Sequence, residues 1–70
     1  MKELTIRNKV KVARIEHGLY NQGDFAKLIG VTRQTINLIE TQKYNPTIRV
    51  CLLISKALDT PLDELFWIEE

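Results

Sequence analysis

The feature that most constrains the fold is a pair of short helical segments separated by only Gly30 and Val31. The first segment follows Asn21, a residue type that favours helix N-caps, and is interrupted at Gly30. The second can begin at Thr32, whose side chain is also suited to an N-cap. Isolated helices shorter than about 12–15 residues are marginal in water. Both segments must therefore be held by packing against the rest of a small core.

Apolar residues recur at helical spacing in both segments. The first is predicted to face inward with Phe25, Ala26, Leu28 and Ile29. The second is predicted to face inward with Ile36 and Ile39. The spacing therefore predicts two amphipathic helices that share one core.

Three further helices are predicted around this pair. One starts at Asn8 and ends at Gly18, which stands where a C-terminal cap would. Val10, Ala13 and His17 are spaced three and four residues apart, which is typical of a helix. Thr47 would cap a second over Ile48–Leu58, which is so apolar that it must be central or covered by a partner. Lys43–Pro46 is a turn, because the residue before a proline avoids helical geometry.

The carboxyl-terminal segment predicts the last helix and a strand. Thr60 would cap the helix, with Pro61 at its first position and its end near Leu65. Phe66–Ile68 can then pair as a strand with Leu4–Ile6. Because 70 residues allow one domain and no linker or repeat is visible, residues 1–70 are expected to form a single unit.

The charge of the chain is segregated along its length. The net charge of the whole chain is only +1, which by itself argues against a nucleic-acid partner. Residues 1–56 nevertheless carry all ten basic residues against four acidic ones, a net charge of +6. Residues 57–70 carry five acidic residues and no basic one, a net charge of −5. The segregation suggests one face for a polyanion and a separate acidic end, and a solvated acidic tail would give the same pattern.

Catalytic and metal-binding chemistry has little support. His17 is the only histidine and Cys51 the only cysteine, so one chain cannot assemble a zinc site. A lone cysteine also allows no internal disulfide, which favours the reducing cytoplasm, and in an apolar stripe it is usually inert. The longest apolar run, Cys51–Ile54, is far short of the ~20 residues that span a bilayer. No signal-peptide pattern is visible. We expect no enzyme, cofactor, metal, small-molecule ligand or membrane segment.

Two short helices joined by a tight turn are the physical description of a helix-turn-helix, here over residues 22–40. In such a unit the second helix enters the major groove of DNA and its N-terminal residues meet base edges. Here these residues are Thr32, Arg33, Gln34, Thr35 and, on the next turn, Asn37. Arginine can pair with guanine, glutamine or asparagine with adenine, and a threonine methyl can contact thymine. An ordinary polar helix surface uses the same residue types.

Longer strings make a family resemblance specific. Gly30–Ile36 reads GVTRQTI and Lys43–Thr47 reads KYNPT. The other matching positions are Gln22, Ala26, Ile39, Glu40, Leu52 and Ile54. Over roughly residues 8–66 the chain resembles the lambda-repressor-like (Cro/Xre) helix-turn-helix family, and its two ends resemble small stand-alone members with terminal strands. The resemblance implies an all-α, five-helix DNA-binding domain, to which the termini can add a two-stranded antiparallel sheet.

The resemblance also implies residue roles. Gln22 matches a glutamine that contacts phosphate and braces the recognition helix, and Arg14 and Glu40 match a buried ion pair. Base or backbone contacts fall at Thr32, Arg33, Gln34, Thr35 and Asn37. Lys43, Tyr44 and Asn45 match a loop that lies along the phosphates and borders the dimer interface. The implied dimer surface contains Asn45, Pro46, Leu62 and Leu65.

Some positions depart from the family pattern. The loop over residues 18–21 is one residue longer than usual. Gly23 should weaken its helix by roughly 1 kcal/mol relative to alanine. Gln42 replaces a usual glycine, so a left-handed cap there would be strained. Leu53 replaces a usual polar residue and could contact a partner subunit.

These features together predict a regulator of transcription that binds double-stranded DNA. We expect it to act in the cytoplasm as a homodimeric repressor on a palindromic operator, with half-sites about 34 Å apart. An antitoxin that binds DNA and a toxin chain is the alternative, because Leu52, Leu53 and the aromatic end offer apolar surface to a second protein. An interaction module that has lost DNA binding is disfavoured by the intact Arg33-Gln34-Thr35 row.

Overall fold

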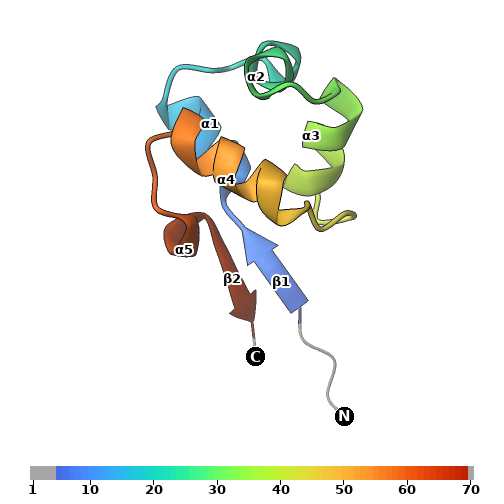
Figure 1. Ribbon diagram of the computed structural model, residues 1–70, viewed down its shortest axis with the longest axis vertical. Helices are drawn as coiled ribbons and strands as arrows, with labels where there is room; N and C mark the ends of the chain where they lie inside the picture. The colour runs from blue at the N-terminus through green and yellow to red at the C-terminus, as the bar shows by residue number, and fades with distance from the viewer. Residues whose placement is uncertain (1–4, 70) are drawn as a thin grey trace.

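The computed structural model describes residues 5–69, which form five helices and two strands. In chain order these are β1 (Thr5–Asn8), α1 (Val10–Glu16), α2 (Gln22–Ile29), α3 (Arg33–Glu40), α4 (Ile48–Ala57), α5 (Leu62–Leu65) and β2 (Phe66–Glu69). Helices α1–α4 gather at one end of the molecule, and strands β1 and β2 extend from them toward the other end (Figure 1). The predicted mostly helical fold with paired terminal strands is confirmed.

One apolar core joins the helices. Its fully buried members are Val10, Phe25, Ile36, Ile39, Ile54, Leu58 and Leu65. The predicted inward faces of α2 and α3 are confirmed except at Leu28, whose side chain is 61% exposed. Leu28 lies about a quarter of a turn around α2 from the face that Phe25 and Ile29 present to the core. Helical spacing alone therefore overestimated the width of the buried face.

Side-chain caps fix the starts of three helices where the sequence predicts them. Asn21, Thr32 and Thr47 each accept a backbone N–H from the first turn of α2, α3 and α4, respectively. The Asn21 Oδ1 accepts the Gly23 N–H at 2.7 Å. A Cβ on residue 23 would lie only 3.0 Å from that same oxygen. Glycine at position 23 therefore avoids a close contact with the capping oxygen. This advantage is not part of the intrinsic helix propensity, which counts glycine as unfavourable.

The starts of α1 and α5 differ from prediction. Helix α1 begins at Val10 rather than Asn8, because Asn8 belongs to β1 and its Oδ1 accepts the Val10 N–H at 3.1 Å. The Thr60 hydroxyl donates to the Leu58 carbonyl at 2.8 Å and does not cap α5. Pro61 instead occupies the N-cap position, without a side-chain cap.

Helices α1 to α4 are each followed by a residue in the left-handed region of backbone conformation. These residues are Gly18, Gly30, Gln42 and Asp59, with φ of 77°, 78°, 61° and 47°. The predicted glycine cap at Gly18 and the predicted strained conformation of Gln42 are both confirmed. For a residue with a Cβ this conformation costs roughly 1–2 kcal/mol. Gln42 and Asp59 therefore bear a cost that the two glycines avoid.

Strands β1 and β2 pair antiparallel. Ile6 lies opposite Ile68 and Arg7 opposite Trp67, so the predicted pairing of the termini is confirmed within residues 5–69, whereas Leu4 lies outside them. An ion pair between the Arg7 Nε and the Glu69 Oε2, 2.6 Å apart, also joins the strands. Two-stranded sheets are marginal on their own in water. This sheet therefore depends on its attachment to the helices.

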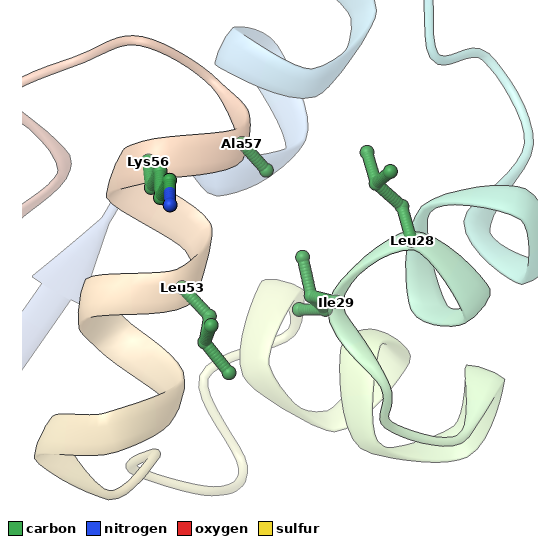
Figure 2. Close-up of a pocket in the computed structure, with 5 residues that line it drawn as sticks. All are labelled: Leu28, Ile29, Leu53, Lys56 and Ala57. Carbon is green, nitrogen blue, oxygen red and sulfur yellow. The ribbon is translucent and has the colours of Figure 1, made fainter.

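An apolar groove separates α2 from α4 (Figure 2). Its volume is about 420 Å³, and it is lined by Leu28, Ile29, Leu53, Lys56 and Ala57. Ile29 and Leu53 come from opposite sides of it, and both side chains extend into the space between the two helices (Figure 2). Lys56 is the one charged side chain in this lining. The groove gives the exposed Leu28 an apolar neighbourhood on the surface.

Candidate nucleic-acid interface

Helix α3 presents a row of polar side chains on the side away from the core. Thr32, Arg33, Gln34 and Asn37 are exposed and Thr35 is half-buried. Ile36 and Ile39 on the opposite side are fully buried. The outward face therefore offers one guanidinium and two amides, the groups that match the hydrogen-bonding edges of base pairs.

The first turn of α3 is held by two threonines. The Thr32 Oγ1 accepts the Thr35 N–H at 3.1 Å, and the two hydroxyl oxygens are 2.9 Å apart. Both hydroxyls therefore take part in the start of the helix, and one of their two protons is left to donate elsewhere. Arg33 and Gln34 lie between them in sequence and project from a turn whose backbone is fixed.

Gln22, the first residue of α2, reaches across to α3. Its Nε2 donates to the Glu40 Oε1 at 2.9 Å and to the Asn37 Oδ1 at 3.4 Å. The contact with Asn37 uses the amide oxygen and leaves the amide hydrogens of Asn37 to face a ligand. Gln22 thus braces α3 in the way that the family resemblance implies.

A buried ion pair lies behind the polar face. The Arg14 Nε donates to the Glu40 Oε2 at 2.8 Å, and its Nη2 donates to the Glu40 Oε1 at 3.2 Å. The two side chains are only 3% and 2% exposed. The remaining Arg14 nitrogen, Nη1, donates to the Leu19 carbonyl at 2.7 Å. One guanidinium therefore joins α1, the loop before α2, and α3.

The loop after α3 carries the other predicted phosphate contacts. Lys43, Tyr44 and Asn45 are all exposed. The Lys43 N–H bonds to the Leu38 carbonyl at 2.9 Å, which attaches the loop to the last turn of α3. The structure thus places Lys43 beyond the C-terminal end of α3 and Arg33 at its N-terminal end. The polar surface extends along the whole helix.

The predicted dimer surface is only partly accessible. Asn45 is exposed, and Pro46 and Leu62 are half-buried. Leu65 is fully buried, because the single turn of α5 directs its last residue into the core. Leu65 therefore has no surface to offer a second subunit, and the expectation for it is corrected. Ile48 and Leu52, one turn apart on α4, are 66% and 54% exposed.

Asn8 is a site-supporting residue that the sequence did not reveal. Its Nδ2 donates to the Ile39 carbonyl at 2.9 Å, so it contacts the last turn of α3. Its only sequence signal is its place between an alternating strand pattern and a helical one. That signal suggests a helix start, but it does not identify a partner 31 residues away.

The described residues offer little for other chemistry. Burial raises the pKa of the half-buried Cys51 thiol, which keeps it protonated and weakly nucleophilic. Within residues 5–69 no group of three or more histidine, cysteine, aspartate or glutamate side chains is placed to hold a metal ion. No helix in this range has the length and apolar character needed to cross a membrane.

Comparison with known proteins shows that the chain is similar to helix-turn-helix regulators of transcription. Residues 10–65 match the helix-turn-helix family profile. YgzD of Bacillus subtilis, an uncharacterised HTH-type transcriptional regulator, is 40% identical over 65 residues, which are 93% of this chain and 97% of the relative. Uncharacterised HTH-type transcriptional regulators of Methanocaldococcus jannaschii and Archaeoglobus fulgidus are 38% and 33% identical, over 93% and 87% of this chain and 97% and 86% of theirs.

The two glutamate ion pairs should differ sharply in their effect on stability. Glu40→Ala leaves Arg14 charged and buried without its carboxylate partner, so we expect the free energy of unfolding to fall by about 3–5 kcal/mol. Glu69→Ala removes an exposed pair with Arg7 and should cost at most about 1 kcal/mol. Urea unfolding followed by circular dichroism measures both. Equal effects would contradict a central role for the buried pair.

Proposed function

Because the chain belongs to the Cro/Xre-type helix-turn-helix family, and so is a DNA-binding transcriptional regulator rather than an enzyme, we propose that it represses transcription as a homodimer on a palindromic operator. Its partner would be double-stranded DNA, and its place of action would be the cytoplasm. Repression would follow from occupancy, because a bound dimer excludes other proteins from the same duplex.

The outward face of α3 is the observation that carries this proposal. Arg33 and Gln34 are exposed on its first turn, and Asn37 follows on the next. Inserted in the major groove, Arg33 would read guanine, and the two amides would read adenine. Helix α3 is held from behind by the core and by Gln22, so these groups approach the bases from a fixed backbone. Thr32 and Thr35 would contact the adjoining sugar-phosphate backbone of the DNA or a thymine methyl.

Phosphate contacts would orient the domain on the duplex. Gln22 at one side of α3 and the loop residues Lys43, Tyr44 and Asn45 at the other would contact the sugar-phosphate backbone. Such contacts fix register and carry no sequence information directly. The net charge of +6 on residues 1–56 favours this approach, and the acidic residues 57–70 would be turned away from DNA.

A second copy of the chain would double the contacts and create a two-fold axis. Two recognition helices about 34 Å apart would enter successive major grooves of a near-palindrome. The proposed dimer surface combines the family positions with the exposed apolar pair on α4; it consists of Asn45, Pro46, Ile48, Leu52 and Leu62. A small domain gains most from such burial, because a chain of this size covers only about 60% of its surface on folding.

Base-reading and phosphate-contacting residues should respond differently to substitution. A duplex selected from a random pool by the wild-type protein provides the probe. Arg33→Ala should weaken binding to it by about 1–3 kcal/mol and relax the preference at one position of each half-site. Lys43→Ala should weaken all sequences about equally and reduce the slope of log affinity against log salt by about one. Fluorescence anisotropy over a salt series measures both, and an Arg33→Ala protein with unchanged preference would refute the groove assignment.

The proposed dimer surface can be tested against a matched position. Ile48→Lys introduces a charge into that surface and should shift the protein to monomers in sedimentation at micromolar concentration. Val12→Lys, at an apolar side chain of α1 that is likewise more than half exposed, should leave the dimer intact. A wild-type protein that sediments as a monomer at that concentration would overturn the dimer.

An antitoxin that also binds a toxin chain is the second candidate function, and the groove between α2 and α4 favours it. Leu28 and Leu53 would pack against apolar side chains of the toxin, and Lys56 would meet a carboxylate. A second chain at fixed stoichiometry should then co-purify from the protein's own host. Leu53→Lys should release the second chain and keep the wild-type affinity for DNA. Val12→Lys should keep the second chain bound. A preparation without a stoichiometric second chain would exclude this candidate.

A further inference from the structure

We propose that Gln42 is a positioning residue, which uses the terminal sheet to hold the C-terminal end of α3 and the following loop in the orientation that DNA requires. The inference rests on the proposed function, because it assigns to Gln42 the placement of the surface described there. It concerns a side chain that has no direct contact with DNA in the proposal.

The backbone of Gln42 bears a conformational cost. Its φ is 61°, in the left-handed region that glycine adopts freely and other residues rarely enter. Its N–H bonds to the Ile39 carbonyl at 3.0 Å and completes the turn that ends α3. Asp59 after α4 has the same backbone conformation, with φ of 47°. A glycine at position 42 would form this turn without strain, so the turn itself gives no reason for a glutamine.

The side chain of Gln42 supplies a reason. Its amide has both of its polar groups satisfied when Nε2 donates to the Ile6 carbonyl at 3.2 Å and Oε1 accepts from the Arg7 Nη1 at 3.0 Å. Both partners belong to β1. A glycine can make neither contact. Strained residues persist where the surrounding structure holds them, and such residues concentrate at functional sites.

Strand β1 is itself firmly placed. Arg7 is paired with Glu69 of β2 at 2.6 Å, which holds its guanidinium beside the Gln42 amide. Asn8 donates from Nδ2 to the Ile39 carbonyl at 2.9 Å and accepts the Val10 N–H at 3.1 Å. The Ile39 carbonyl thus receives one hydrogen bond from Asn8 and one from Gln42. Two side chains therefore join the terminal sheet to the last turn of α3.

This connection determines where the loop after α3 lies. The Lys43 N–H bonds to the Leu38 carbonyl at 2.9 Å, so Lys43 follows any movement of the last turn. The N-terminal end of α3 is already fixed by the Thr32 cap and by the buried Ile36. With the sheet attached at the other end, the whole reading helix is held at both ends. Glu40 and Ile39 still hold the last turn of α3 when the Gln42 amide is removed, but the loop that starts at residue 42 loses its side-chain attachment to β1 and can shift against the phosphates.

Three variants separate positioning from stability. Gln42→Gly removes the side chain and relieves the strain, so the melting temperature should hold or rise. Its affinity for the duplex selected by the wild-type protein should still fall about threefold to tenfold. Gln42→Met keeps the length and the strain but lacks the amide, and should lose both stability and affinity. Asp59→Gly is the matched control: it relieves the same strain, should raise the melting temperature by several degrees, and should keep wild-type affinity.

A loss of affinity without a loss of stability in Gln42→Gly is the signature of positioning, since a merely structural role makes affinity follow stability. Wild-type affinity in Gln42→Gly would overturn the inference. Amide hydrogen exchange on the free protein provides a readout that needs no DNA. The backbone N–H groups of residues 42 and 43 should exchange at least tenfold faster in Gln42→Met than in the wild-type protein. The backbone N–H of Ile54 should exchange at an unchanged rate after correction for global stability. Unchanged exchange at Lys43 would also overturn it, whereas failure of the wild-type protein to select any duplex would instead refute the proposed function.

Discussion

The buried pair of Arg14 and Glu40 is the interaction on which the other contacts of the site depend. Both charges lie out of water, so each needs the other, and only one arrangement of α1 against α3 satisfies them. The same carboxylate also receives Gln22, which carries the constraint from the interior to the surface that meets the ligand. Three helices that are each too short to persist alone are thereby fixed in one geometry.

Helix α3 contributes to the core with one face and to the proposed DNA contact with the other. Its buried isoleucines belong to the core, and its exposed polar residues are released from any role in packing. The supports that hold it come from distant parts of the sequence: Arg14 and Gln22 on one side, Asn8 and Gln42 on the other. A helix of eight residues can therefore present a rigid surface although its own backbone hydrogen bonds could not maintain one.

The order and start of most elements could be predicted because local physics determines them. Asn21, Thr32 and Thr47 cap helices through atoms two or three residues away, and helical spacing located most of the core. Failures occurred where a different local bond competes with the cap, or where burial depends on contacts between distant segments. Thr60 bonds backward to Leu58, and the exposure of Leu28 and the burial of Leu65 depend on how helices pack. The roles of the Asn8 and Gln42 side chains need two chain segments brought together, which no local pattern encodes.

The exposed row on α3 has a consequence for how this domain can diverge. Among residues 5–69, Arg33 and Gln34 form no side-chain hydrogen bond, so the fold places few demands on what stands there. Asn37 differs, because its Oδ1 accepts a hydrogen bond from the Gln22 Nε2. New recognition sequences can therefore arise by single replacements at positions 33 and 34, whereas a change at 37 calls for an accompanying change at 22. The two kinds of position would evolve at different rates, the first freely and the second as a pair.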